Sequence, residues 1–480
     1  MSFASIAAAE AAGAVGAARA GAASASSADL YAARTQMGLT LGFHIILAAI
    51  GIGLPALTVF AEWRALRTGD RHYAELARRW AKATGVLFAV GAVSGTVLSF
   101  EMGTLWPRFM DTYGQVFGTG FAMEGIAFFI EAIFIGIYLY GRDRLPPRVH
   151  LLTGIPVVVA GLASAFFVVT VNAWMNQPRG FRLDGHGRVT DVDPLAAMFN
   201  PATPVQATHL ILAALMVCGF VVASVYAVPL LRGRGDRYHR LGFAVPFTMG
   251  AVVAPVQVVV GDWATRFVAD RQPIKFAAME GIAHTRAGVP FRFAVLEIPN
   301  GLSTLLRFDP HATLRGLDSW PVAVRPPAEV VRTSFEIMIV IGFGLLGLSA
   351  WWALSWWRRH RSGGGPLRSR LFLLAAAPSG VAAAIAMEAG WTTTEVGRQP
   401  WIVYGVMRTA EAVNPSPGLR YGLYIVLVGY AVLGVVTVTV LRRLRRPDPG
   451  PGPEGRPDRP HDPLGERPAV PAAAEGRGRR

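Results

Sequence analysis

The sequence has a single cysteine among 480 residues, Cys218, which stands within an apolar run. One cysteine cannot form a disulfide within the chain, supply the Cys-x-x-Cys-His attachment of a c-type haem, or hold an iron–sulfur cluster. A lone cysteine among apolar neighbours is typical of a small buried residue. Any redox centre in this protein must therefore be held by other side chains.

Charged residues are also scarce, at 16% of the chain, whereas soluble domains carry about 25%. Apolar residues instead gather in runs near the ~20 residues that a helix needs to cross a bilayer. Barrel strands would be shorter and would alternate. The sequence therefore predicts an all-α integral membrane protein with about nine transmembrane helices. The runs are Leu39–Phe60, Gly85–Met102, Phe121–Tyr140, Leu151–Val171, Val205–Leu230, Leu241–Val260, Phe335–Trp357, Leu371–Trp391 and Tyr421–Leu441.

Basic residues form a short cluster after every odd-numbered run, beginning at Arg64, Arg142, Arg232, Arg358 and Arg442. The positive-inside rule therefore puts the N-terminus outside and the C-terminus in the cytoplasm, which an odd number of spans allows. These clusters account for the net charge of +15, so no nucleic acid is expected as a partner.

The remaining segments complete the organisation. Residues 1–35 are rich in Ala and lack the continuous apolar core of a signal peptide, which predicts a disordered extension. Residues 36–260 hold helices one to six, and residues 333–441 hold helices seven to nine. Between them, 261–332 form a long outer loop, and loops of that length are usually functional. Residues 442–480 are rich in Pro, Gly and Arg and predict a disordered basic cytoplasmic tail.

Histidine is nearly absent from the apolar runs. Of ten histidines only His44 and His209 are embedded, and the others, including His150, are assigned to loops. A haem–copper oxidase needs ligands for two haems and a three-histidine copper, so no copper is expected. Ionisable residues inside a membrane span are costly and are functional candidates by default. The embedded acids are Glu124, Glu131, Glu336 and Glu388.

Five side chains that can bind metal or protons lie at one depth: His44, Glu124, His209, Met338 and Glu388. Each is a few residues from the outer end of its run, about 5–10 Å below the outer surface. His, Met and carboxylate can all ligate haem iron, and a His/Met pair makes an electron-transfer haem. Singly, such a His or Met is more often a packing residue. Together, the layer favours a haem site.

Glu124 and Glu131 are seven residues apart, so both face the same side of the third helix. Glu131 is then about 10 Å deeper toward the cytoplasm. A ladder of carboxyl groups running inward suits proton delivery. The alternative is a pair of neutralised structural acids bonded to neighbouring helices.

Seven segments resemble the successive signatures of cytochrome bd oxidase subunit I, in the order of that family. They cover about Gln36 to Leu441, and EAGW followed by GRQPW is the most specific. The segments read LTLGFHIILAAIGIGLP, FAMEGIAFFIEAIFIGIYLYGRDRL, VNAWMNQP, QATHLI, QPIKFAAME, FEIMI and MEAGWTTTEVGRQPW.

The resemblance implies a quinol:O₂ oxidoreductase that carries two b-type haems and one d-type haem, a chlorin. His209 and Met338 match the axial ligands of the low-spin b haem. His44 and Glu388 match the axial ligands of the two high-spin haems, and which site holds the chlorin stays open. Glu124 matches an acid beside the di-haem site, and Glu131 matches its deeper partner on the proton path.

The resemblance also implies residues for quinol and for the haem pocket. Lys275 and Glu280 match loop residues of quinol oxidation. Arg398, Trp391 and Trp401 belong to the haem pocket, where an arginine can pair with propionates. Quinol would be oxidised at the outer face, and the protons for water would come from the cytoplasm, which builds a membrane potential without pumping.

The implied setting is the bacterial inner membrane. The implied partners are the lipid bilayer, membrane quinol, O₂ and a second large subunit that makes a heterodimer, with a small single-helix subunit left open. Ser99 and Glu101 depart from the common family pattern and resemble the cyanide-insensitive branch. Glu336 also departs, and the outer loop is of the short type.

Two other functions stay open. A proton-coupled transporter would use Glu124, Glu131 and Asp262, but such proteins usually contain inverted repeats and broken helices, and the sequence has no evident repeat. An electron-transfer b-type subunit would never meet O₂, and the presence of chlorin would distinguish the oxidase from it. The identity of the quinol is also left open.

Overall fold

The computed structural model describes residues 27–293, 296–362, 367 and 369–444. Within these ranges nine helical segments are long and apolar enough to cross a membrane, which confirms the predicted all-α membrane fold. The eighth segment consists of two helices, α12 and α13. The helices are α2 (Ser27–Thr68), α3 (Arg71–Leu105), α4 (Pro107–Gly141), α5 (Pro147–Asn176), α7 (Thr203–Leu231), α8 (Arg237–Arg271), α11 (Ala328–Ser362), α12 (Arg370–Ala376), α13 (Ser379–Gly397) and α15 (Leu419–Leu444).

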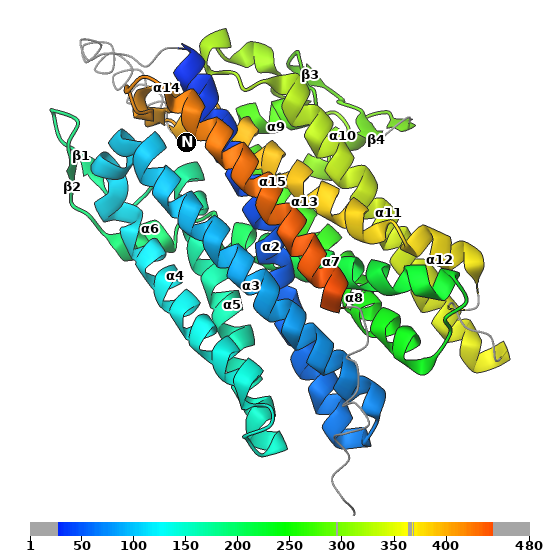
Figure 1. The fold of residues 1–480 in the computed structure, drawn as a ribbon. Coiled ribbons are helices and arrows are strands. Elements are labelled where there is room, and N and C mark those ends of the chain that lie inside the picture. Colours follow the sequence, from blue (N-terminus) through cyan, green and yellow to red (C-terminus); the bar gives the residue numbers. More distant parts are fainter. Residues whose placement is uncertain (1–26, 294–295, 363–366, 368, 445–480) are drawn as a thin grey trace, which may run out of the picture.

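The long helices run side by side in one elongated bundle (Figure 1). Helices that follow one another pack together in the pairs α2–α3, α4–α5 and α7–α8. Helix α2 also contacts α5, α7 and α13, while α13 contacts α7 and α11. These contacts place α2, α7 and α13 at the centre of the bundle.

Short elements gather at the end of the bundle where α2 begins (Figure 1). They include four two-stranded antiparallel ladders, β1–β2, β3–β6, β4–β5 and β7–β8, which an all-α prediction does not contain. This end corresponds to the predicted outer side. The elements are β1 (Arg182–Leu183), β2 (Val189–Thr190), α6 (Pro194–Met198), α9 (Pro273–Met279), β3 (Arg286–Ala287), β4 (Phe291–Phe293), β5 (Leu296–Ile298), α10 (Gly301–Arg307), β6 (Thr313–Leu314), η1 (Leu317–Ser319), η2 (Val322–Val324), β7 (Trp401–Val403), β8 (Met407–Arg408) and α14 (Thr409–Ala412).

The helices extend beyond the apolar runs. Helix α2 begins at Ser27, so the prediction of disorder over residues 1–35 is wrong for residues 27–35. Helix α8 continues to Arg271, and the outer loop therefore starts about ten residues later than predicted. A helix satisfies its own backbone hydrogen bonds and need not end where the hydrocarbon ends. Residues 1–26 and 445–480, which hold the rest of the predicted extension and tail, lie outside the described residues.

Small residues allow the central helices to approach closely, as is usual in membranes. A Cβ on Gly53 would lie 2.4 Å from Cβ of Cys218, and one on Gly219 would lie 2.7 Å from the Gly250 backbone. Cys218 is fully buried at this crossing, which confirms its predicted packing role. Substitution of either glycine would push the helices apart.

Candidate functional site

His44 of α2 is held by a hydrogen bond that leaves one ring nitrogen free. Its Nδ1 lies 2.9 Å from Oγ of Ser94 in α3, and that hydroxyl donates to the Gly91 carbonyl at 3.0 Å. Because Ser94 gives its proton to Gly91, its oxygen accepts from Nδ1–H of His44. The Nε2 atom then keeps a lone pair, which is the form of imidazole that binds a metal.

Glu388 of α13 lies against α2 close to His44. The place where a Cβ on Gly42 would stand is 3.2 Å from Oε2 of Glu388, and Gly42 precedes His44 by two residues. The other carboxyl oxygen, Oε1, is buried and has no hydrogen-bond partner among the residues that the structure describes. Buried carboxyl oxygens are normally satisfied, so an unpartnered one indicates a ligand or proton site. Glu388 therefore meets α2 within one turn of His44, whose ring faces Ser94 of α3.

His209 and Met338 are each positioned by a different neighbour. Nε2 of Gln257 in α8 is 3.3 Å from both ring nitrogens of His209, and Oε1 of Gln257 is buried without a partner. Met338 of α11 packs on α13, where a Cβ on Gly390 would lie 2.9 Å from its sulfur. Gly390 therefore makes room for the thioether two residues after Glu388.

The helices that carry these four side chains share one apolar cluster. Side chains within three residues of His44, His209, Met338 and Glu388 along their helices belong to this cluster or pack against it. Trp391, predicted for the haem pocket, packs against the same cluster. These neighbours are Leu41, Ile45, Leu210, Ile211, Ile341 and Met387.

Glu124 and Glu131 both face α5, as their spacing predicted. The Ser164 hydroxyl donates to Oε1 of Glu124 at 3.3 Å. Oε1 of Glu131 lies 3.3 Å from the position of a Cβ on Gly161, and Glu131 is buried. Both carboxyl groups therefore lie at the α4–α5 interface, where each can hold a proton.

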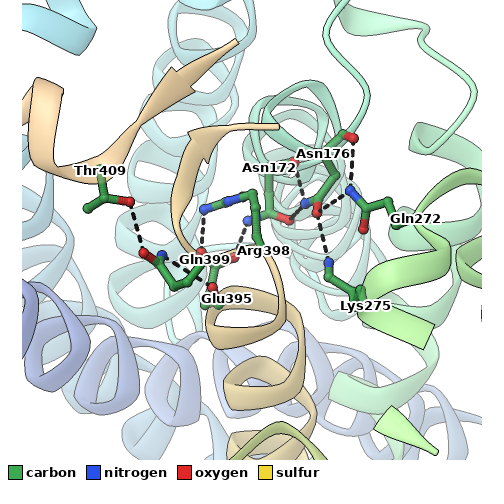
Figure 2. Close-up of polar contacts among 8 residues, drawn as sticks. All are labelled: Asn172, Asn176, Gln272, Lys275, Glu395, Arg398, Gln399 and Thr409. Carbon is green, nitrogen blue, oxygen red and sulfur yellow. Dashed lines mark hydrogen bonds and ion pairs between the residues drawn. The ribbon is translucent and has the colours of Figure 1, made fainter. Parts of the chain in front are cut away.

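Lys275 is buried on the short helix α9, with only 3% of its surface exposed. Its Nζ donates to Oδ1 of Asn176 at 2.9 Å, and Asn176 in turn donates to the Asn172 carbonyl at 2.9 Å. Asn172 Nδ2 donates to Oε1 of Glu395 in α13. Figure 2 shows this chain of contacts, which ties α9 to the ends of α5 and α13. The stem of Lys275 packs on Gly397, where a Cβ would lie 2.9 Å from its Cγ.

Arg398 closes the other side of the same network (Figure 2). Nη2 donates to Oε2 of Glu395, while Nε and Nη1 are buried and have no partner in the described part of the chain. An unpartnered buried guanidinium is costly unless an anion is supplied. Trp401, on β7, is half-buried beneath the Arg408 guanidinium at 5.5 Å. These residues can therefore hold a carboxylate group of a cofactor.

The pKa values of Lys275 and Glu280 are shifted in opposite directions, and each shift favours the neutral form of the side chain. Burial, with a smaller contribution from the positive charge of Arg398 and against the opposing effect of Glu395, lowers the pKa of Lys275 to about 7. Burial, with a smaller contribution from the charge of Glu336 and against the opposing effect of Arg332, raises the pKa of Glu280 to about 7. Both groups on this loop can therefore exchange a proton near pH 7.

Glu336 forms an ion pair with Arg332 one turn away, at 2.8 Å. Arg332 also packs over Gly281, whose φ of +64° suits a glycine. The pair lies beside Glu280, and Glu336 precedes Met338 by two residues on α11. Glu336, which departs from the common family pattern, is therefore a charged neighbour of the loop rather than an isolated acid.

Several assignments change in the structure. His72, His239 and His360 lie in α3, α8 and α11 rather than in loops. Asp262, which a transporter would use, is exposed on α8 and pairs with Arg266 at 2.8 Å, away from Glu124 and Glu131. His150 is not in a loop but in α5, and it is almost fully buried. The two prolines before it, Pro146 and Pro147, carried the missed signal, because proline favours the first turn of a helix.

Comparisons with known proteins agree on one family. Residues 32–449 match the sequence profile described as cytochrome bd terminal oxidase subunit I. A Bacillus subtilis (strain 168) protein with the provisional name cytochrome bd menaquinol oxidase subunit I is 35% identical over 431 residues, which cover 86% of this chain and 96% of that protein. Cytochrome bd ubiquinol oxidase subunit 1 of the same organism is 29% identical over 444 residues, covering 87% and 93%.

A solved structure gives the same result for the fold. The bd oxidase from Geobacillus thermodenitrificans matches with a TM-score of 0.81 and 38% sequence identity. The match covers 87% of this chain and 99% of that one. The similarity therefore extends over nearly all of the described bundle.

Proposed function

The chain belongs to the family of cytochrome bd terminal oxidase subunit I, and we propose that the residues described above carry its electron and proton transfers. It is subunit I of a haem-containing quinol oxidase, a membrane-bound enzyme that acts on quinol and O₂. It is a multi-pass protein of the bacterial cytoplasmic membrane. The proposals below concern the individual residues, the haem types and the second subunit.

His44 and Glu388 hold the irons of the two high-spin haems, one b-type and one d-type. His209 and Met338 hold the low-spin b haem, and no copper takes part. The observation that carries this assignment is the buried Oε1 of Glu388, which has no hydrogen-bond partner among the described residues, in a carboxyl group that meets α2 within one turn of His44. The available Nε2 of His44 supports it. A haem supplies reversible electron storage and, at an open coordination position, O₂ binding.

Lys275 and Glu280 accept the protons of the quinol. Oxidation of one quinol releases two electrons and two protons, so two bases are needed at the site. Burial keeps a fraction of Lys275 as a neutral amine and leaves Glu280 partly ionised near pH 7. Each can therefore take one proton as electrons leave, and the exposed loop end of the bundle lets the protons escape.

Arg398 binds a propionate with the two N–H groups that lack a partner. Glu395 holds its third nitrogen and so fixes the plane of the guanidinium. Trp391 and Trp401 complete this pocket with aromatic surface. The connection through Asn172 and Asn176 then couples Arg398 to Lys275, so the quinol residues and the propionate residue are held in one rigid frame (Figure 2).

Glu131 and Glu124 deliver the protons that O₂ reduction consumes. Their carboxyl groups lie on one face of α4 and each can hold and pass a proton at an oxygen facing α5. The supply comes from the side opposite the quinol loop.

A second large subunit completes the enzyme as a heterodimer. Helices α4 and α5 expose large apolar side chains on their outer faces, which suit either lipid or another membrane helix. These include Ile126, Phe129, Ile133, Leu152 and Val159.

Oxygen uptake by the purified membrane complex tests the proposed reaction. Reduced short-chain ubiquinol and menaquinol are supplied separately, and O₂ and quinone are followed together. We expect two quinols to be oxidised for each O₂ consumed, because reduction of O₂ to water takes four electrons. Absence of O₂ uptake with either quinol, in a complex that contains haem, would contradict the proposal.

A further inference from the structure

A second group of buried polar side chains lies at the other end of α4, near the clusters of basic residues. Glu62 of α2, Tyr138 and Arg142 of α4 and His150 of α5 meet there, and we name them the inner cluster. The exposed fractions of Glu62, Tyr138 and His150 are 7%, 6% and 2%. None of these residues belongs to the site already described.

The contacts within the inner cluster require a shared proton. Nε2 of His150 is 2.8 Å from the Tyr138 carbonyl, and a carbonyl only accepts, so Nε2 carries a hydrogen. Nδ1 of His150 is 2.6 Å from Oε1 of Glu62, and that hydrogen bond needs a second proton between the two atoms. The pair therefore holds one proton more than a carboxylate and a neutral imidazole would.

The tyrosine hydroxyl joins this pair to the rest of α4. It donates to Oε2 of Glu62, the carboxyl oxygen that His150 does not use. The Arg142 guanidinium lies beside the same hydroxyl, and its Nη2 is buried without a partner. A buried N–H of this kind indicates a water or an anion at the mouth of the cluster.

Tyr138 continues the ladder of carboxyl groups on α4. It follows Glu131 by seven residues, as Glu131 follows Glu124, so all three face one side of the helix at intervals of about 10 Å. On α5 the facing positions are Gly161, next to Glu131, and Gly154, where a Cβ would lie 3.0 Å from the Tyr138 ring. Both glycines make room for these side chains at the interface.

A small cavity lies beside Tyr138 and Ile135, between α2, α3, α4 and α5. Its volume is about 20 Å³, counted as the space open to the centre of a water molecule. Tyr138, Thr58, Thr84 and Ile135 line it, and Ile135 is one turn from Glu131. Its walls are otherwise apolar, but this volume is enough for one water. A water there can bridge part of the distance from the tyrosine to the carboxyl group.

We propose that the inner cluster is the place where protons from the cytoplasm are taken up, and that Tyr138 and the cavity water pass them to Glu131. A proton from bulk water joins the His150–Glu62 pair. The Tyr138 hydroxyl first turns from Glu62 toward the cavity; Glu62 then gives a proton to its oxygen, and the tyrosine gives its own proton to the cavity water, which protonates Glu131. The tyrosine stays neutral, and another proton from bulk water then joins the His150–Glu62 pair. This relay rests on the proposed function, because it supplies the protons that O₂ reduction consumes.

A purely structural role is the competing explanation, since the same contacts tie α2, α4 and α5 together. The two roles differ in what they change. Loss of a clamp lowers the stability of the complex, whereas loss of a relay slows proton uptake in a complex that is still intact.

The test compares the complete, haem-loaded complex with three variants: Glu62→Gln, Tyr138→Phe and Ile135→Phe. The first two remove proton-carrying groups, and the third fills the cavity without touching a polar atom. Glu75→Gln is the matched control, because Glu75 is a carboxylate near the same end of the bundle that pairs only with Arg78 and Arg79 in the described contacts. Each complex is reduced, mixed with O₂, and followed by a pH-indicating dye and by its visible spectrum in H₂O and D₂O.

We expect proton uptake to slow by roughly tenfold or more in each of the three variants, with a larger D₂O effect, because a lost proton-transfer group typically costs at least this much. The visible spectrum of the reduced complex and the rate in Glu75→Gln stay unchanged. If Glu62→Gln does not assemble, Tyr138→Phe and Ile135→Phe carry the test. Uptake within twofold of the parent in these variants would overturn the relay. Failure of the parent complex to reduce O₂ would instead count against the proposed function.

Discussion

Gly42 and the carboxyl group of Glu388 face each other where α2 crosses α13, with 3.2 Å between Oε2 and the place of a Cβ on residue 42. A distance this short is below ordinary van der Waals contact. The absence of a side chain at Gly42 therefore lets the Glu388 carboxyl group lie against α2, within one turn of His44.

The variant Gly42→Ala should displace the Glu388 carboxyl group and weaken its bond to iron. We expect the high-spin part of the visible spectrum to shift and O₂ reduction to slow, while the low-spin band from His209 and Met338 stays unchanged. Gly51→Ala on the same helix is the control, because a Cβ there meets no protein atom within 4 Å. An unchanged high-spin spectrum in Gly42→Ala would show that Glu388 is not a ligand.

The variant Met338→Leu should keep the packing on Gly390 and lose the sulfur ligand. Such a swap changes little in volume and usually costs less than about 1.5 kcal/mol of stability. We expect the low-spin haem signal to become high-spin in the purified complex, as seen by visible and electron paramagnetic resonance spectra. Met216→Leu, a buried methionine of α7 outside the site, should leave both spectra unchanged. A full low-spin signal in Met338→Leu would remove Met338 from the ligand set.

The rate of quinol oxidation should rise as the pH rises through about 7. Lys275 accepts a proton only as the neutral amine and Glu280 only as the carboxylate, and both forms accumulate above a pKa of about 7. Lys275→Met and Glu280→Gln should each slow the reaction by roughly tenfold and flatten this rise. The measurement is kcat/KM for quinol between pH 5.5 and pH 8.5 (about one and a half pH units on either side). Asp262→Asn, outside the loop, should keep the parent profile, and an unaltered profile in both loop variants would contradict their role.

The turn between α2 and α3 depends on Asp70. Its side chain accepts from the His72 backbone N–H at 2.9 Å and pairs with Arg237 of α8 at 2.7 Å. Burial alone would raise the pKa of Asp70, but these hydrogen bonds lower it to about 2. Its stabilising effect is therefore present above about pH 4 and is lost as the pH falls through about 2.

We expect Asp70→Ala to lower the stability of the complex at neutral pH by about 1 kcal/mol, mainly through loss of the helix cap. Asp70→Asn keeps the cap and should lose less, because the ion pair with Arg237 is largely exposed. Thermal denaturation of the purified complex in detergent measures both. Equal stability of Asp70→Ala and the parent would show that the cap is not needed in the assembled bundle.

The proposed haem ligands could be found in the sequence because an ionisable side chain inside a membrane span is energetically costly, and such a side chain is visible in the local sequence. A histidine or glutamate inside an apolar run stands out without any knowledge of the fold, as His44, His209 and Glu388 do. The arginine clusters gave the orientation of the spans, and the position of each residue within its run then placed all of them at one depth. Met338 was harder, since a methionine in a membrane span carries no such cost, and it depended on the resemblance.

His150 and Glu62 could not be identified in the same way. Each stands at the edge of an apolar run beside arginines, where charged groups are normally solvated. Their burial results from the packing of α2, α4 and α5, which joins residues 88 positions apart. Local hydropathy contains no information about such contacts.

The loop end of the bundle was also beyond sequence reasoning. Lys275 reads as an exposed loop residue, yet α9 buries it against Gly397 and Asn176. The two-residue strands that frame this loop are too short to give a periodic signal. The helical start of α2 at Ser27 was missed because the Ala-rich segment before it resembles a disordered extension.

The most direct test is a dithionite-reduced minus air-oxidised visible spectrum of the purified membrane complex. The assignment of His44, His209, Met338 and Glu388 predicts a red-shifted chlorin band beside the bands of b-type haem. Bands of b-type haem alone would keep the ligand positions but reject the chlorin. The absence of any haem signal from a properly inserted protein would contradict the whole account.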